Sequence, residues 1–408
     1  MSERLNVIVA GLIGQYPIGG VTWDYVQYLL GLRALGHKVW YIEDSEQWPY
    51  NPDENGCGRE ARYNVEYLAG VMGRFDLADR WSYRFPGGSL PSGEVFPERL
   101  YGLSPERRRQ VIAHADVLIN VSSGIGDPLR YRDVPRLVYV DTDPVFTQIR
   151  AVQDPRFRAH LDAHDAHFTY GECPSHAVPD TGHHWRPMRK PIAMDQWDPS
   201  RARRDVFTTV MNWTSYGDVT WNGRGYGQKD QEFLRFLDLP ALAAPHIFEL
   251  AIGGGITRRA PRDVLVERGW RLVDPLTRCA GLDDYRRYIE TSKGEWTVAK
   301  NAYVEGRSGW FSGRSACYLA AGNPVVVQDT GFSPPLPTGV GIVAFNTLEQ
   351  AVVGVREVAS HWRHHSRAAR EIAEAYFDAG RLTSRLLDDV SSSSPHAAAA
   401  AVQRGPTP

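Results

Sequence analysis

The residues best suited to chemistry lie in one stretch, 295–331, where cations, hydroxyls and glycines are concentrated. Within it, four small or basic residues come just before an alanine-rich segment, 316–321, that we predict to be a helix. These four residues are Ser312, Gly313, Arg314 and Ser315. The first N–H groups of a helix have no partner within it, and the helix dipole is positive at that end, so phosphate groups bind there. The stretch therefore predicts a phosphate site, although the same pattern also occurs in α/β units that only support a sheet.

A buried strand is predicted after this helix. Gly322 and Pro324 are typical of a helix end, and 325–327 is an apolar run typical of a parallel strand. The residues that follow it include Asp329, Thr330 and Gly331. Open α/β sheets bind ligands at the carboxyl ends of their strands, so we expect these three residues to contact a ligand.

The first 44 residues predict the unit that opens an α/β domain. An apolar strand over 5–11, an amphipathic helix over 21–35 and a second strand over 37–44 follow one another. Such a unit has parallel strands joined by a right-handed crossover. The glycines between the first strand and the helix are not spaced as in the GxGxxG fingerprint of dinucleotide-binding domains.

Acidic residues follow a later strand of the same half. The pattern predicts strands over 116–121 and 136–140, and Asp141 and Asp143 come just after the second. Both are candidates for a general base at the ligand-binding edge, as is Asp24 in the first helix. Structural roles are the alternative: Asp24 would stabilise a first helical turn, and Asp141 would cap a turn.

A second alternation of strands and helices begins near 207, after a segment rich in proline, tryptophan and cations. The predicted fold class is therefore α/β, with two Rossmann-like, doubly wound parallel-sheet domains facing a cleft. The aromatic-rich segment 45–103, with one predicted helix over 59–75, is interpreted as a ligand-facing insertion. The predicted divisions are a first domain over 1–193, a hinge over 194–204, a second domain over 205–365, a C-terminal helix over 366–390 that could return to the first domain, and a disordered tail over 391–408.

Composition narrows the class of partner. The 46 basic and 48 acidic residues give a net charge of −2, which disfavours binding to nucleic acid and favours small molecules. The four cysteines are scattered, the N-terminus lacks the layout of a signal peptide, and no apolar run reaches a membrane span. We therefore expect a cytoplasmic protein in a reducing compartment.

Two histidine patterns are candidates for metal binding. His160, His164 and His167 have helical spacing, and HxxHH occurs over 361–365. Such patterns more often lie on solvated faces than around a metal, so we expect no metal site.

Several motifs resemble those of GT-B glycosyltransferases of families 4 and 1. YPIGG over 16–20, followed by LRALGHKV over 32–39, is similar to the P-x-GG and L-x-x-x-GH-x-V opening of family 4. Gly223 and Arg224 with Lys229 resemble its GR…K element, and AAGNPVV over 320–326 is close to its A-x-G-x-PVV. The motifs keep their order along about residues 4–390.

The resemblance implies an enzyme that moves a sugar from a UDP-, TDP- or GDP-linked donor to a small-molecule or glycan acceptor, with specialised metabolism as the expected setting and no metal or other cofactor. The residues that it implies for the donor diphosphate, beside those at 312–315, are Arg224, Lys229, Gly19 and Gly20. Those implied for the donor nucleoside or sugar are Gly253, Gly255, Val273, Asp329, Thr330 and Gly331. The catalytic base would be Asp143, Asp141 or Asp24.

The chain departs from the family where a glutamate binds the ribose of the donor, because Cys317 stands at that place. A second alignment matches 309–312 to the H-x-GWNS motif of family 1, with Arg307 in place of the histidine and Ser315 in place of the glutamate. Glu295 and Glu305 are other candidates for the missing carboxylate.

Three alternatives fit parts of the pattern. An NDP-sugar hydrolysing epimerase shares the architecture but does not need the aromatic insertion. A non-catalytic sugar-nucleotide-binding protein would explain the loss of the ribose glutamate. A glycosyltransferase acting on DNA bases is disfavoured by the near-neutral charge.

Overall fold

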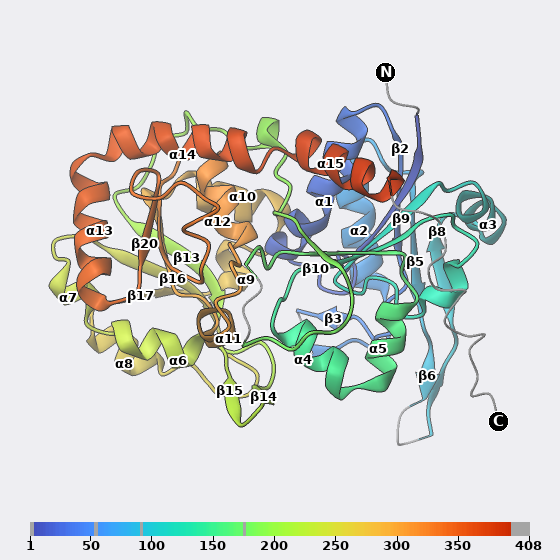
Figure 1. Cartoon of the computed structure of the whole chain (residues 1–408), viewed down its shortest axis with the longest axis horizontal. Helices are drawn as coiled ribbons and strands as arrows, with labels where there is room; N and C mark the ends of the chain where they lie inside the picture. Colours follow the sequence, from blue (N-terminus) through green and yellow to red (C-terminus); the bar gives the residue numbers. More distant parts are fainter. Residues whose placement is uncertain (1–3, 53–55, 90–92, 174–176, 393–408) are drawn as a thin grey trace.

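Two α/β halves lie side by side in the computed structural model of the chain (Figure 1). The structure describes residues 4–52, 56–89, 93–173 and 177–392. The tail predicted over 391–408 lies outside these residues from 393 on. None of the helices in the described ranges is long and apolar enough to cross a membrane.

The first half is built on an eight-stranded sheet with the order β12-β11-β10-β9-β1-β2-β5-β8. All neighbours are parallel except β5 and β8, which are antiparallel. The strands are β1 (Asn6–Ala10), β2 (Lys38–Glu43), β5 (Trp81–Phe85), β8 (Arg99–Gly102), β9 (Val117–Val121), β10 (Leu137–Asp141), β11 (Ala166–Thr169) and β12 (Trp185–Pro187). The helices are α1 (Gly19–Ala34), α2 (Arg62–Arg74), α3 (Pro105–Ala113), α4 (Phe146–Gln153) and α5 (Pro155–Asp162).

The second half has a six-stranded, fully parallel sheet with the order β17-β16-β13-β18-β19-β20. Its strands are β13 (Phe207–Asn212), β16 (Phe248–Gly253), β17 (Arg271–Val273), β18 (Gly294–Thr297), β19 (Val325–Gln328) and β20 (Ile342–Phe345). Its helices are α6 (Lys229–Phe233), α7 (Leu239–Leu242), α8 (Arg262–Glu267), α9 (Pro275–Arg278), α10 (Leu282–Glu290), α11 (Asn301–Glu305), α12 (Gly313–Ala320) and α13 (Leu348–Ser360). The two sheets confirm the predicted fold class.

The C-terminal segment is two helices rather than the single one predicted. The first, α14 (Trp362–Tyr376), covers the second half, and the next, α15 (Ala379–Ser391), lies against α1 of the first half (Figure 1). Backbone bonds of 2.8 and 2.9 Å join Ile192 to Phe377 and Ala379 at the break between the helices. At Gly31 a Cβ would lie 2.7 Å from the carbonyl oxygen of Ala379, so α15 packs this closely because residue 31 is glycine.

Contacts between the halves are dense. One hydrophobic cluster includes Val9 and Trp23 of the first half and Ala316 and Val327 of the second. The Trp23 indole donates a 3.0 Å hydrogen bond to the carbonyl of Leu282. The carboxyl ends of the two sheets therefore face each other across a packed junction.

Two segments differ from the sequence prediction. The insertion at 45–103 supplies β5 and β8 to the main sheet, together with two short two-stranded pieces: β3 (Tyr50–Asn51) with β4 (Gly56–Cys57), and β6 (Gly88–Ser89) with β7 (Val95–Phe96). The segment 217–227, whose four glycines are typical of a loop, contains a hairpin of β14 (Val219–Trp221) and β15 (Arg224–Tyr226). This hairpin contacts α4, and Gln153 Nε2 donates to the carbonyl of Thr220 at 2.8 Å.

His164 and His167 are buried and His160 is half-buried, which corrects the prediction of a solvated face. Helix α5 ends at Asp162, so His164 and His167 are not on it, and His167 belongs to β11. Both side chains lie in an aromatic cluster with Tyr139 and Trp185, and burial lowers the pKa of each, that of His167 to about 4. Among the described residues, no group of three or more His, Cys, Asp or Glu side chains could hold a metal ion.

The stability of the protein should fall as the pH falls from about 6.5 to about 4. His167 stays neutral in the folded state over this range, whereas it takes up a proton in the unfolded chain, so acid favours unfolding. We expect His167→Gln, whose amide can also donate to the carbonyl of Leu161, to lose less stability between pH 7 and pH 4.5 than the wild type, by about 2 kcal/mol. Urea denaturation at both pH values checks this, and equal losses would contradict it.

Candidate functional site

A narrow pocket lies at the carboxyl edge of the second sheet, where β18, β19 and the start of α12 meet. Its polar lining residues are Thr297, Ser312, Ser315, Gln328 and Thr330, and its apolar ones are Val298, Ala299, Trp310, Phe311, Val327 and Phe332. All of these lining residues except Phe332 belong to the stretch 295–331.

Helix α12 begins at this pocket with unused hydrogen-bonding groups. Ser312 is its N-cap residue but makes no side-chain capping bond, and the first intrahelical bond runs from Ala316 N to Ser312 O at 3.0 Å. The Ser315 hydroxyl is buried and has no partner among the described residues. The helix start therefore offers N–H and O–H donors together with the positive end of its dipole.

Lys229 is a buried cation at the first position of α6. Within the described ranges its ammonium makes no hydrogen bond and no ion pair. Its pKa lies well below the usual value, first because burial disfavours the charge and then because Arg314 is positive; the Glu295 carboxylate opposes this shift and Lys300 adds to it. The residues before it, Gly227 and Gln228, are hydrogen bonded to α11, which begins beside the pocket wall at Val298–Ala299. A buried cation without a partner indicates a site for an anion.

Arg314 is not available to a ligand, contrary to the sequence prediction. Its guanidinium donates to Glu295 Oε1 at 2.5 Å, to the carbonyl of Val210 at 2.7 Å and to Thr297 Oγ1 at 3.0 Å. Glu295 is fully buried, and Arg314 is the cation that neutralises it. Arg314 therefore has a structural role beneath the site.

Arg224 also lies apart from the pocket lining. Its side chain is 51% exposed on the β14–β15 hairpin and pairs with Glu305. The GR…K resemblance assigned both Arg224 and Lys229 to the donor diphosphate. In the structure Arg224 is exposed and paired, whereas Lys229 is buried and has no ion pair within the described residues. Glu305 is correspondingly engaged and does not line the pocket.

The glycine pair at the start of α1 packs against the other half. The Gly19 N–H donates to the carbonyl of Ala280 at 2.8 Å, and a Cβ at Gly19 would lie 2.3 Å from the carbonyl oxygen of Gly281. A Cβ at Gly20 would lie 3.1 Å from the Tyr285 ring. In this arrangement the pair lets α1 and α10 approach closely, and the Gly19 N–H is already used.

The three candidate carboxylates differ in availability. Asp141 is buried and accepts hydrogen bonds from Thr147, Gln148, Thr169 and the N–H of Asp143, which favours a structural role. Asp143 is 31% exposed at the junction of the halves. Asp24 is 55% exposed, bonds the Lys190 ammonium at 2.7 Å and lies beside Gly313.

The remaining predicted contacts lie along the same sheet edge. Thr330 lines the pocket and its hydroxyl donates to the carbonyl of Trp310 at 2.5 Å, whereas Asp329 binds the N–H of Gly331 at 2.9 Å. Gly253 ends β16, and Val273 ends the edge strand β17. Gly255 has φ +87°, and a Cβ there would lie 2.2 Å from the carbonyl oxygen of Arg258, so this turn requires glycine.

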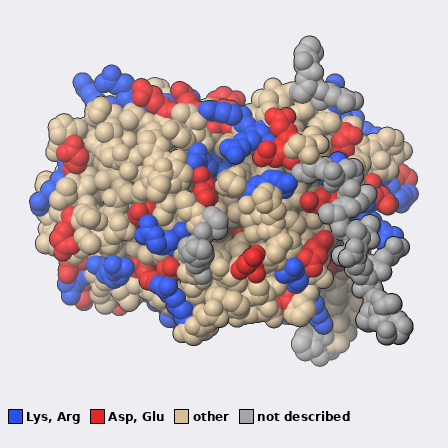
Figure 2. Space-filling view, viewed as in Figure 1, with Lys and Arg blue, Asp and Glu red and all other residues tan. Residues whose placement is uncertain are grey.

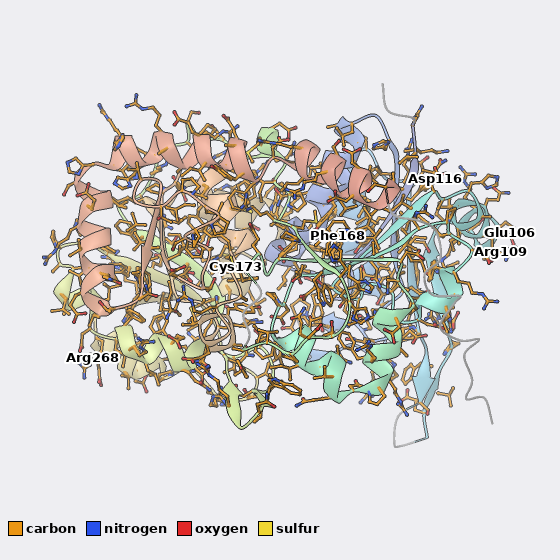
Figure 3. All side chains as sticks on the ribbon, in the orientation of Figure 1. Glu106, Arg109, Asp116, Phe168, Cys173 and Arg268 are labelled. Atoms are coloured by element: carbon orange, nitrogen blue, oxygen red, sulfur yellow. The ribbon has the colours of Figure 1, made fainter. Side chains whose placement is uncertain are left out.

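Cys317 does not face the pocket. Its thiol is buried between α12 and α1, where Gln27 Nε2 lies 3.9 Å from the sulfur. The other cysteines, Cys57, Cys173 and Cys279, are also free. Cys173 is labelled at the junction of the halves in Figure 3, and its N–H donates to the carbonyl of Ser308 at 3.0 Å.

Ser315→Ala and Cys317→Ala should show which face of α12 binds the donor. We expect the serine variant to raise the KM for a nucleotide-sugar donor about fivefold to tenfold, because one hydrogen bond to the donor is lost. The cysteine variant should leave this KM unchanged and lower the melting temperature slightly through a small cavity. Steady-state kinetics and thermal denaturation check both, and a raised donor KM for Cys317→Ala alone would show that the donor binds on the other face.

The sequence analysis missed Lys300 and its aromatic neighbours. Lys300 precedes α11, and its ammonium lies 4.3 Å from the ring centre of Tyr216 and 5.3 Å from that of Tyr303. The Trp310 ring stacks on Tyr303 at 4.3 Å. The only signal in the sequence was a lysine just past a buried strand, which the family motifs do not include.

Solved structures that the chain resembles include several glycosyltransferases. An alpha-glucosyltransferase in complex with UDP and a 13-mer DNA containing a HMU base matches at a TM-score of 0.53, with 11% identity over 96% of this chain and 100% of that chain. The Anabaena protein HepE in complex with UDP-glucose matches at 0.54, with 11% identity over 95% and 99% of the two chains. Sucrose-phosphate synthase from Thermosynechococcus elongatus matches at 0.52, with 12% identity over 95% and 99%.

These matches show that the chain has the GT-B fold, as the motifs implied. At such identities they show the fold alone. No protein-family model matches the chain, and no curated protein gives a significant match.

Proposed function

We propose that the protein is a glycosyltransferase that uses a nucleotide-diphosphate sugar, linked to UDP, TDP or GDP, as donor. The observation that carries the proposal is the buried ammonium of Lys229, which has no hydrogen bond or ion pair within the described residues, together with the unused N–H and O–H groups at the start of α12. Lys229 is not itself among the pocket-lining residues and would reach the diphosphate from behind them. Transfer of a sugar leaves a nucleoside diphosphate, whose developing charge must be stabilised. A preorganised cation in a site that excludes water is suited to that task.

Each group has a role in this proposal. Lys229 contributes one positive charge to the diphosphate site, and the N–H groups at the start of α12 with the Ser312 and Ser315 hydroxyls donate to the phosphate oxygens. Thr330 and the wall formed by Trp310 contact the donor sugar or nucleoside. The proposal includes no metal ion, so we expect activity to persist in a chelator.

The acceptor is proposed to be a small molecule or a glycan that enters from the first half, with specialised metabolism and the cytoplasm as the setting. Asp143 and Asp24 are the carboxylates exposed at the junction and so the candidates for a base in an inverting reaction. The face in Figure 2 carries Lys and Arg interspersed with Asp and Glu among the described residues, which supports the expectation that nucleic acid is not a partner.

Incubation with radiolabelled UDP-, TDP- and GDP-sugars tests the proposal. We expect slow release of a nucleoside diphosphate from one donor, and faster release with a suitable acceptor from a panel of glycans, aglycones and DNA. Release of a free sugar with inverted configuration at C2 would instead indicate a hydrolysing epimerase. Nucleotide binding without turnover would indicate a non-catalytic binding protein, and neither binding nor turnover would contradict the proposal.

A further inference from the structure

Lys300 lies at the edge of the donor pocket but is bound to the opposite half. It directly follows Val298 and Ala299, which line the pocket. Its side chain is 15% exposed, and its ammonium donates to Asp143 Oδ1 at 3.0 Å and to the hydroxyl of Tyr216. The Lys300–Asp143 pair thus joins the carboxyl ends of β18 and β10, one from each half.

Asp143 does not depend on Lys300 alone. The hydroxyl of Tyr303 also donates to Oδ1, and that of Tyr216 donates to Oδ2. The carboxylate is partly exposed, so water can reach it. If the ammonium left, Asp143 would keep two hydroxyl donors and would not be a bare buried charge.

The described residues that line the donor pocket include no lysine or arginine, so the cations that bind a diphosphate must reach it from neighbouring positions. A diphosphate ester carries two negative charges, and Lys229 supplies one positive charge. Arg314 is fully used by Glu295, Val210 and Thr297, and Arg224 is exposed and paired with Glu305. Lys190 packs against Gly313 at the start of α12, but its ammonium is bound to the carbonyl and the carboxylate of Asp24. Lys300 directly follows the pocket-lining residues Val298 and Ala299, so it is the candidate for the second cation.

We infer that Lys300 is the second phosphate-binding cation of the donor site and that Asp143 holds it until a donor diphosphate takes it over. The inference rests on the proposed function. The four-carbon stem of lysine lets the ammonium swing between partners while the backbone stays in place. Because the exchange breaks the ion pair between the halves, donor binding would also expose the Asp143 carboxylate to an acceptor.

We test this exchange of partners by substituting Lys300 and Asp143 separately, because the two substitutions should change nucleotide affinity in opposite directions. Calorimetry with UDP, and with TDP and GDP in parallel, would compare the wild type with Lys300→Met, Asp143→Asn and the double variant. We expect Lys300→Met to weaken UDP binding about 10-fold to 100-fold. Asp143→Asn should tighten it several-fold, because the competitor for Lys300 is weakened, and the double variant should behave as Lys300→Met.

Two control variants make the outcome decisive. Lys300→Arg should retain most of the affinity, and Lys293→Met, which removes a lysine paired with Asp205, should not change it. If the wild type binds UDP but Lys300→Met binds as tightly, or if Asp143→Asn weakens binding, the inference is overturned while the proposed function stands. If the wild type binds none of the three nucleotides, both are overturned. If Lys300→Met does not fold, Asp143→Asn alone still tests the inference, because it should tighten UDP binding and not weaken it.

Discussion

Lys229→Met is expected to abolish sugar transfer and, at the same time, to stabilise the ligand-free protein. Lys229 is the buried cation that we propose for the diphosphate, so kcat/KM should fall about 100-fold to 1,000-fold, as when one transition-state hydrogen-bond donor is removed. Methionine is similar to lysine in length, and the substitution removes a buried charge that has no partner within the described residues. The free energy of unfolding should therefore rise by about 1–3 kcal/mol.

Kinetics with the active donor and thermal denaturation without ligand measure the two effects. Lys293→Met is the matched control, because Lys293 pairs with Asp205 at 2.5 Å and is not part of the pocket lining. It should keep full activity and lose a little stability. A Lys229→Met protein that is both inactive and destabilised would show that Lys229 has a structural partner, and the assignment of the anion site would fail.

Arg314→Met should have the opposite effect on stability to Lys229→Met, because it should lower the free energy of unfolding severely. The substitution leaves the fully buried Glu295 carboxylate without its cation, which typically costs about 3–5 kcal/mol. Glu295 already has one buried oxygen without a partner among the described residues, so little compensation is at hand. Urea denaturation of the variant measures the cost.

A second substitution separates charge from packing. Arg314→Met combined with Glu295→Gln removes both charges and should recover at least half of the lost stability. If Arg314→Met instead unfolds like the wild type and only raises the donor KM, then Arg314 binds phosphate, as the sequence alone predicted.

The contrast between Lys229 and Arg314 shows what the sequence could predict about the site. The start of α12 and the two sheets follow from local patterns: small residues before a helix, and apolar runs bounded by glycine and proline. Arg314 is not free to bind a ligand because it contacts Val210, Glu295 and Thr297, which come from two other strands. Such long-range contacts leave no mark in the spacing of residues.

Glu43 shows the same limit in the first half. It ends β2, a place where dinucleotide-binding domains use an acid to bind ribose. Here the buried carboxylate accepts from the N–H groups of Gly14 and Gln15 and from the Tyr41 hydroxyl, and burial raises its pKa to about 7. The glycine spacing predicted that the loop between β1 and α1 is not a dinucleotide-binding site. Only the structure shows that Glu43 accepts hydrogen bonds from the backbone of this loop.

Local sequence patterns also could not predict the β14–β15 hairpin or the contacts at the junction of the two halves, for a different reason. Thr220 and Trp221 read as part of a loop because the segment contains four glycines over 217–227, yet they form a strand that packs against α4 of the first half. Lys300 likewise acquires its partner only when the two sheets face each other. Where the halves meet, the pairing follows from the way the halves pack and not from either half alone.

The position of a bound diphosphate tests the central claim most directly. In a crystal structure of the complex with UDP, we expect a phosphate oxygen within about 2.7–3.2 Å of Lys229 Nζ and another at the same distance from Ser315 Oγ or an N–H of the first turn of α12. A diphosphate bound instead at Arg224 on the hairpin, with Lys229 still lacking a contact, would contradict the account.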